Sequence, residues 1–471
     1  MHSSSFVPSA ELRRRFALSL AALYGSEVPA YNTLVEVSRE VNRDVLAARG
    51  RAAERLGDIG RVTAERHGAI RVGSPAELAQ AARVFAAFGM YPVGFYDLRD
   101  GAGTGVPVVS TAFRPTDSGE LARNPFRVFT SMLATDDRRF FDADTRRRLA
   151  TFFAQRRLFA PELLAVADRA AAGHGLTGQD AGTLLDLATE AFRLSREPVD
   201  RAWHDHLSAI SSVAADIGGV SSTHINHLTP RVLDIDELYR RMRARGIEMI
   251  DAIQGPPKWK GPDVLLRQTS FRAMAERRLF RSADGTVVPG EMRIRFGEVE
   301  QRGIALTAAG LALYDRAVTE VAQAAHGLSA AGRPAVAARI WERVFPASEA
   351  ALESSGTGWF TYEVTPGSRP SAGDAALSEL VSAGLLAARP VVYEDFLPRS
   401  AAGIFRSNLS SAGSRDDTLG GAGYDAGRLS GIVGQAVSDP QDLYRAQRDQ
   451  SLADAGKQLG IVIVDDTPAS A

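Results

Sequence analysis

The stretch Ser222-Thr-His-Ile-Asn-His-Leu-Thr-Pro-Arg231 decides how the rest of the chain is interpreted. It holds two of the eight histidines of this 471-residue sequence, three positions apart. The pattern from Ile225 to Val232 indicates a strand, and a helical pattern follows from Asp234 to Arg245. Side chains three positions apart on a strand point to opposite faces, so only one of His224 and His227 can face a common site.

The elements around this stretch occur twice along the chain. Downstream, strands are predicted at Val264–Phe271 and Met292–Glu300, with a turn at Asp284-Gly285. The same order occurs upstream as a strand at His67–Val72, a helix capped by Ser74, and strands at Tyr91–Leu98 and Val106–Arg114. A histidine begins each set, so the sequence predicts one β-α-β-β-like unit that is present twice.

The fold class we expect is α+β, with the two units forming one open barrel, a helical insert and flanking helices. The predicted divisions are an N-terminal helical region (1–66), the first unit (67–118), the insert (119–215), the second unit (216–307) and a C-terminal helical and loop region that completes the site (308–471). Within the insert, the residues from Pro125 to Val213 have a helical, charged pattern. We therefore expect a helical insertion there and no part of the catalytic site. Ser410–Gly434 predicts a long loop, and Asp439–Leu459 predicts a closing helix.

Composition excludes several classes of protein and site. The 45% apolar and 24% charged residues are typical of a globular protein, and 55 basic against 56 acidic residues leave no excess of charge for a nucleic-acid partner. The absence of cysteine excludes disulfides, thiolate metal sites and cysteine nucleophiles. Any metal must therefore be bound by nitrogen and oxygen, which favours Fe(II), Mn(II) or zinc.

The N-terminus has two interpretations. Arg13 to Tyr24 has the basic and apolar parts of a secretion signal, but no small-x-small cleavage site follows. An amphipathic helix that ends at Gly25 explains the same residues. No apolar run has the length of a membrane span, so we expect a cytoplasmic protein without a membrane partner. The sequence does not indicate an oligomeric state.

Two histidines and a carboxylate on three strands would form the facial arrangement that leaves positions open on Fe(II). His67 begins the first unit, and one histidine of the stretch Ser222–Arg231 begins the second. The carboxylate would come from Glu298 or Glu300, which share a strand face, and parity does not choose between them. The histidines in helical or Gly-rich segments are interpreted as ordinary polar residues: His174, His204, His206 and His326.

Five blocks of the sequence closely resemble the 2-oxoadipate dioxygenase/decarboxylase family. They are Arg66–Val72, His224–Arg231, Leu266–Phe271, Phe296–Gly303 and Tyr393–Gly403. The resemblance implies a vicinal-oxygen-chelate-type core and a non-haem Fe(II) centre. It also implies conversion of 2-oxoadipate and O2 to 2-hydroxyglutarate and CO2 in lysine breakdown. The Phe296–Arg302 run is similar to the strand that supplies the iron-binding glutamate in 4-hydroxyphenylpyruvate dioxygenase.

The resemblance implies roles for individual residues. The family's metal ligands and catalytic residues correspond to His67, His227 and Glu298. Its substrate-binding arginine corresponds to Arg71, four residues after His67, and a loop contact made through the backbone falls near Arg399. We also place His67 itself at the substrate.

Five other side chains have expected roles. Gln268 and Ser270 alternate inward on one strand, and Ser110 has a comparable place in the first unit. Each is expected to contact substrate, to orient a ligand or to satisfy buried backbone groups. The alternative role for Arg71 is a salt bridge to an acid such as Glu65. Gln301 and Arg302 are expected to tie down the end of the strand that carries Glu298.

These residue types suit a small 2-oxo dicarboxylate as substrate. An arginine can bind a carboxylate through two parallel hydrogen bonds, which would select a dicarboxylate over a monocarboxylate. Two other functions are open to a protein with the same site residues. One is an oxygen-independent, metal-dependent isomerase or lyase, and the other is a protein that binds a small acid without turnover. An anaerobic assay separates the first from a dioxygenase.

Overall fold

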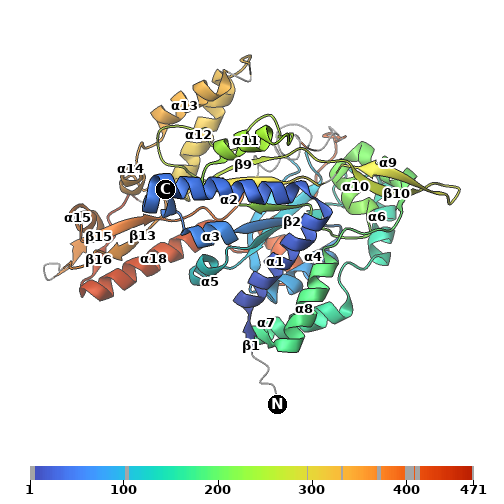
Figure 1. Ribbon diagram of the computed structural model, residues 1–471, viewed down its shortest axis with the longest axis horizontal. Helices are drawn as coiled ribbons and strands as arrows, with labels where there is room; N and C mark the ends of the chain where they lie inside the picture. Colours follow the sequence, from blue (N-terminus) through green and yellow to red (C-terminus); the bar gives the residue numbers. More distant parts are fainter. Residues whose placement is uncertain are drawn as a thin grey trace.

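A five-stranded sheet lies at the centre of the chain, and its strands come from distant parts of the sequence (Figure 1). The structure is a computed structural model that describes residues 6–100, 105–293, 295–329, 332–368, 373–397, 408 and 414–468. The strand order is β3-β4-β5-β2-β8, with β2 parallel to β5 and antiparallel to β8. Their bounds are β2 Arg66–Val72, β3 Tyr91–Asp97, β4 Val108–Arg114, β5 Arg127–Leu133 and β8 His227–Pro230.

The stretch between Pro125 and Val213 was predicted to be helical, but it begins with strand β5. All seven of its residues are buried, and it is the parallel neighbour of β2. A short strand buried on both faces lacks the polar alternation that would distinguish it from a buried helix. Helix α5 (Ser118–Arg123) precedes this stretch. Helices form most of the rest of it, with two short strands between them: α6 Ala143–Gln155, α7 Pro161–Gly173, β6 Gly175–Thr177, α8 Gly178–Ala191, β7 Val199–Asp200, α9 Arg201–Ile210 and α10 Ser212–Gly219.

A second set of strands continues from β8. β12 (Glu298–Arg302) pairs antiparallel with β9 (Leu266–Ser270), and a bridge between Arg231 and Glu300 places β12 parallel to the end of β8. Gln254 bridges the other side of β9. The order β8, β12, β9 and the Gln254 segment therefore matches the order β2, β5, β4, β3. The order of pairing is thus the same in both sets, and it includes two segments that the sequence did not predict as strands, β5 in the first set and the Gln254 segment in the second.

The prediction of one continuous strand over Met292–Glu300 is wrong. β11 (Val287–Met292) ends where it was expected to begin, and β12 starts at Glu298. Between them, a side chain on Gly297 would meet the Phe271 ring within 2.0 Å, so the chain passes too close to that ring for a regular strand with side chains. β11 instead forms a hairpin with β10 (Glu276–Arg281), whose tip contains the predicted Asp284-Gly285 turn.

Alternate residues of β2 face two different cores. Ile70 and Val72 pack into a cluster with the N-terminal helices and α4, whereas Ala69 packs with Phe129 and helices α6, α9 and α10. His67 and Arg71 share the face of Ala69. The covering helices are α1 Ser9–Glu27, α2 Ala30–Arg49, α3 Ile59–Ala64 and α4 Pro75–Ala86, and α11 (Ile235–Ala244) follows β8 as α4 follows β2 (Figure 1).

The C-terminal part packs as a separate apolar cluster beside β9 and β12. The predicted closing helix is confirmed as α18, but the expected loop Ser410–Gly434 contains helix α17. No helix in the described ranges is both long and apolar enough to cross a membrane. The bounds are α12 Ala308–Ala324, α13 Arg333–Val344, α14 Glu349–Ser354, β13 Phe360–Val364, β14 Ala375–Ala376, α15 Leu377–Ser382, β15 Leu386–Pro390, α17 Ala426–Val433, α18 Pro440–Leu459 and β16 Ile463–Val464.

Candidate metal centre

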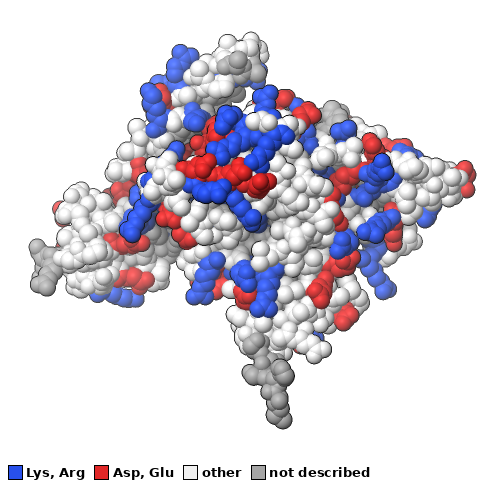
Figure 2. Space-filling view, viewed as in Figure 1, with Lys and Arg blue, Asp and Glu red and all other residues white. Residues whose placement is uncertain are grey.

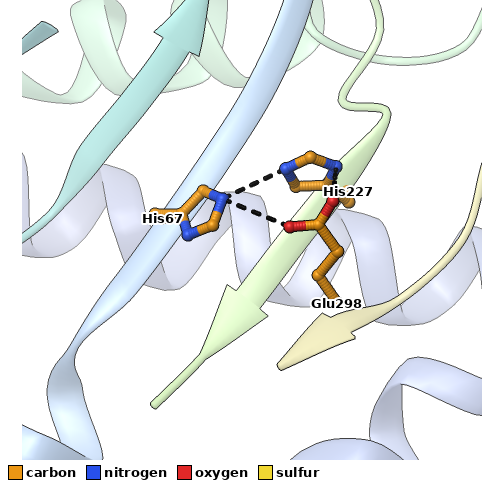
Figure 3. Close-up of side chains that lie close together, drawn as sticks. All are labelled: His67, His227 and Glu298. Atoms are coloured by element: carbon orange, nitrogen blue, oxygen red, sulfur yellow. Dashed lines mark hydrogen bonds and ion pairs between the residues drawn. The ribbon is translucent and has the colours of Figure 1, made fainter. Parts of the chain in front are cut away.

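Three side chains from three strands meet on the sheet face that carries Ala69: His67 of β2, His227 of β8 and Glu298 of β12 (Figure 3). Ala69 lies directly opposite His227, so the two histidines are diagonal neighbours on one face. Nε2 of His67 is 3.2 Å from Nε2 of His227 and 3.6 Å from Oε2 of Glu298. Nδ1 of His227 is 3.4 Å from Oε1 of Glu298. One donor atom of each residue lies within 4.8 Å of the others.

The surroundings of this cluster suit a divalent cation. His67, His227 and Glu298 are 2%, 4% and 5% exposed. Burial, with a contribution from Glu300, raises the pKa of Glu298 to about 8, and burial lowers the pKa of His227 well below its ordinary value. Nδ1 of His227 is buried without a hydrogen-bond partner in the described part of the chain. Neutral imidazoles and a carboxylate whose charge needs a counter-ion fit a transition-metal ion.

Glu300 has a different position from Glu298, although both lie on the same face of β12. Nδ1 of His67 donates to Oε2 of Glu300 at 2.8 Å, which leaves Nε2 directed at the cluster. Burial acts to raise the pKa of Glu300, but Arg302 and His67 outweigh it and lower the pKa to about 2. Glu300 is therefore an ionised acceptor that fixes the orientation of the His67 ring.

A buried network of arginines and carboxylates supports Glu300. Arg302 donates to both carboxylate oxygens of Glu300, at 2.7 and 3.0 Å. Arg127 lies between Glu300 and Glu65, and it also donates to Glu394. Positively and negatively charged side chains are thus held together away from solvent. Because they are buried, removing one of these charges leaves its partner as an unpaired buried charge.

Arg302 and Gln301 behave as expected from the sequence. Arg302 donates to the backbone carbonyls of Tyr393 and Asp395, at 2.7 and 3.1 Å. Gln301 donates to Asp263 and accepts from the backbone N–H of Ile235. Both residues attach the end of β12 to neighbouring segments, which confirms the predicted anchoring role.

We expect Glu300→Gln to lower the affinity for a metal by about 10- to 100-fold, because the His67 ring loses its ionised acceptor. The change also breaks a buried ion pair. Glu394→Gln is the matched control, since Glu394 belongs to the same network through Arg127 and Arg61 but has no contact with His67. Both variants should unfold at a lower temperature, and only Glu300→Gln should weaken metal binding in a titration of the metal-free protein. Equal affinities in the two variants would contradict the role of Glu300.

Arg71 lies on the same face of β2 as His67 and is 5% exposed. Its Nη1 donates to Asp216 of α10, so the alternative interpretation of a salt bridge to an acid is confirmed, with Asp216 and not Glu65 as the acid. Asp216 also accepts from Nδ2 of Asn226 at 3.0 Å, and its other oxygen lies 3.3 Å from Nε2 of His224. Burial acts to raise the pKa of Asp216, but His224 and Arg71 hold it well below its ordinary range. His224 is thus outside the His-His-Glu cluster and contacts the partner of Arg71.

A pair of serines lies in the same row of the sheet as Arg71. Arg71 is opposite Ser131 in the β2–β5 register, and Ser131 is opposite Ser110 in the β4–β5 register. The two hydroxyls are 2.8 Å apart and buried. Sequence analysis identified Ser110 but missed Ser131, because it did not recognise β5. The β-branched and aromatic residues Val128, Phe129 and Thr130 were the available signal for a strand.

The second row of polar residues comes from β9. Ser270 is opposite Glu298 and Gln268 is opposite Glu300, so both share the face of the carboxylates, and both are buried. The Ser270 hydroxyl accepts a hydrogen bond from Nδ2 of Asn408 at 2.8 Å, a contact that sequence analysis missed. Arg399, the remaining predicted substrate residue, lies outside the described residues.

Aromatic rings cover the histidines. The Phe396 ring meets His67 at 4.8 Å and Phe129 at 4.9 Å between ring centroids. Phe296 meets His227 at 5.5 Å. These rings limit the access of water to the cluster, which strengthens electrostatic interactions inside it.

Comparisons with known proteins give one consistent result. A family model described as 2-oxoadipate dioxygenase/decarboxylase matches residues 16–408. Proteins with this name from Mycobacterium bovis and Escherichia coli are 55% and 38% identical, and the matches cover 95% and 94% of the chain and 98% and 97% of those proteins. A crystal structure of hydroxyglutarate synthase in complex with 2-oxoadipate from Pseudomonas putida has a TM-score of 0.83 at 34% identity, covering 97% of this chain and 99% of that one.

Proposed function

Because the chain belongs to the 2-oxoadipate dioxygenase/decarboxylase family, we propose that it converts 2-oxoadipate and O2 to 2-hydroxyglutarate and CO2. The observation that carries the proposal is the buried His67, His227 and Glu298 cluster on the sheet face that also holds Arg71. The reaction balances, because the six-carbon 2-oxo acid loses one carboxyl group as CO2 and both atoms of O2 remain in the products.

Fe(II) is the metal that we propose for the cluster. His67 and His227 would each donate one ring nitrogen and Glu298 one carboxylate oxygen, which leaves positions open for small molecules. Bound Fe(II) supplies the redox chemistry with O2 that amino-acid side chains lack. Glu300 keeps the Nε2 atom of His67 directed at the metal position. The rings of Phe396 and Phe296 keep water away from it.

Substrate binding is assigned to polar residues of the same face. Arg71 would bind a substrate carboxylate through its guanidinium fork, and His67 would contact the substrate at the metal position. Ser110 with Ser131, and Ser270 with Gln268, flank this space on either side and supply neutral hydrogen-bond groups. A backbone contact near Arg399 completes the proposed set.

The location of the site implies an arrangement for the whole chain. We propose that the two strand sets enclose the cluster as an open vicinal-oxygen-chelate-type barrel, with the units at 67–118 and 216–307. The segments 1–66, 119–215 and 308–471 would form the flanking helical parts and complete the site. A cytoplasmic location and a place in lysine breakdown accompany this proposal.

Asp216→Asn is expected to raise KM for 2-oxoadipate by about tenfold, since one charge-assisted hydrogen bond to Arg71 becomes a weaker neutral one. The amide retains the size of the carboxylate, so kcat should change less than KM. Steady-state kinetics at saturating O2 and Fe(II) measure both parameters. A fall in kcat with an unchanged KM would contradict a role in holding Arg71 for substrate binding.

The reaction is tested with protein that has been reconstituted anaerobically with Fe(II). Addition of 2-oxoadipate and O2 should consume the two in equal amounts and yield equal amounts of 2-hydroxyglutarate and CO2. Product formed without O2 would indicate an isomerase or lyase. Tight binding of 2-oxoadipate by iron-loaded protein without turnover would indicate a binding protein and would end the proposal.

A further inference from the structure

A cleft of about 1030 Å³ opens between helices α1, α2 and α3, on the side of β2 away from the metal cluster. Figure 2 shows this face, with basic and acidic side chains together over α2 and over α1 and uncharged surface between the two groups. The apolar walls come from α1, α2 and α3: Ala17, Leu18, Ala21, Val35 and Ile59. The volume and the mixture of apolar walls with a few polar groups are typical of sites for small molecules.

The charge in the cleft is positive and only partly neutralised. Arg39 and Arg43 lie one helical turn apart on α2 and both line the cleft. Neither has a carboxylate within ion-pair distance in the part of the chain that the structure describes. The two acids of α2 that also line the cleft, Glu36 and Glu40, are paired with Arg245 outside it.

Two buried polar side chains line the cleft. Tyr31 is 2% exposed, and its hydroxyl has no hydrogen-bond partner among the described residues. Arg66 is also buried; its Nη1 donates to the backbone carbonyls of Thr63 and Glu65, while its buried Nε has no acceptor in the described ranges. Burial raises the pKa of Tyr31, and the neighbouring Arg66 and Arg39 partly offset the rise. Buried donors without acceptors are rare in proteins, and both of these belong to side chains that line the cleft.

We propose that this cleft binds a small organic anion, with a carboxylate or phosphate group against Arg39, Arg43, Arg66 and Tyr31. The apolar body of the ligand would lie against α1. Arginine donors and a tyrosine hydroxyl form charge-assisted hydrogen bonds with either group, and the apolar walls add affinity for a body of matching size. The site is separate from the metal centre and does not depend on the proposed reaction.

The floor of the cleft is connected to the segments that carry the metal cluster. Arg66 directly precedes His67 in β2. The Tyr31 ring meets the Tyr24 ring edge-on, with centroids 5.0 Å apart. The Tyr24 hydroxyl lies within hydrogen-bonding distance of two backbone carbonyls, 3.1 Å from that of Asn226 and 2.8 Å from that of Phe296. These carbonyls belong to the residue before His227 and to the residue two positions before Glu298.

Fluorescence titration with 1-naphthoate, 1-naphthyl phosphate and neutral 1-naphthol tests the proposal. Metal-free protein should bind at least one of the two anions at a single site, and naphthol about tenfold or more weaker, because naphthol lacks the charge that the arginines recognise. The tighter of the two anions identifies the preferred head group. Arg39→Gln/Arg43→Gln should weaken binding of that anion by about tenfold or more. Arg51→Gln, an exposed arginine outside the cleft, is the control and should leave binding unchanged.

Three results would overturn the proposal. Naphthol that binds as tightly as both anions would mean that the cleft recognises only apolar surface. Unchanged anion binding in Arg39→Gln/Arg43→Gln would place the probe elsewhere. Loss of binding in His227→Ala, with the melting temperature retained, would place it at the metal centre. Tyr31→Phe gives a second, milder test, since it removes only the hydroxyl and should weaken anion binding while naphthol binding stays constant.

Discussion

Glu298→Gln is expected to abolish stoichiometric metal binding and to lower kcat/KM for 2-oxoadipate by at least about 1000-fold, because the only anionic donor of the cluster is lost. Glutamine has nearly the same size and shape, so the packing around it is retained. Burial raises the pKa of Glu298 to about 8. A neutral amide should therefore leave the metal-free protein at least as resistant to heat as the parent at pH 7.

This combination separates a ligand from a structural residue. The variant should lose metal and turnover without losing stability, whereas disruption of a buried ion pair lowers stability. Glu300→Gln is the internal comparison: at saturating Fe(II) it should keep most of its metal, and it should melt at a lower temperature. If Glu300→Gln lost its metal and Glu298→Gln retained it, the two glutamates would have exchanged roles and the proposed ligand set would be wrong.

Removal of the Arg71 guanidinium should lower kcat/KM for 2-oxoadipate by about 100-fold or more, since a buried bidentate ion pair with the substrate is lost. Arg71→Gln alone would leave Asp216 as a buried carboxylate with fewer partners, and this cost would obscure the result. The informative comparison is therefore between Asp216→Asn and Arg71→Gln/Asp216→Asn. Both proteins carry a neutral asparagine at position 216, so neither has an unpaired carboxylate there.

The same pair of variants tests which part of the substrate Arg71 recognises. If Arg71 binds the carboxylate distant from the 2-oxo group, 2-oxohexanoate should be an equally poor substrate for both proteins. The preference for 2-oxoadipate over 2-oxohexanoate should then fall by about the same factor as kcat/KM for 2-oxoadipate. A preserved preference in the protein without Arg71 would assign dicarboxylate selection to another residue.

Several features of the site followed from local sequence patterns. His67 and one histidine of the stretch Ser222–Arg231 begin two similar units, which predicted that both would face one site. The family resemblance identified the second histidine as His227, and the structure places its Nε2 3.2 Å from Nε2 of His67. Strand parity correctly allowed only one histidine of the stretch Ser222–Arg231 at this site, but it could not separate Glu298 from Glu300. That distinction depends on the position of β2, because Glu300 contacts Nδ1 of His67 across the sheet.

Other features depend on tertiary contacts that no local pattern contains. Asp216 is the first residue of the predicted second unit and lies in a short helix that crosses its boundary with the insert. Only the folding of α10 against β2 brings this residue to Arg71. Ser131 was missed for a different reason, since β5 is buried on both faces and so lacks a diagnostic alternation of polar residues. The predicted insert therefore contributes Ser131 next to Arg71, and the residue directly after the insert, Asp216, is the ion-pair partner of Arg71.

The most direct test of the central claim is anomalous diffraction at the iron absorption edge, from crystals of protein reconstituted with Fe(II) without oxygen. We predict one peak per chain within about 2.0–2.3 Å of a ring nitrogen of His67, a ring nitrogen of His227 and a carboxylate oxygen of Glu298, which are ordinary metal–ligand distances. A peak bound by other residues, or no peak at this cluster in crystals of active protein, would contradict the account.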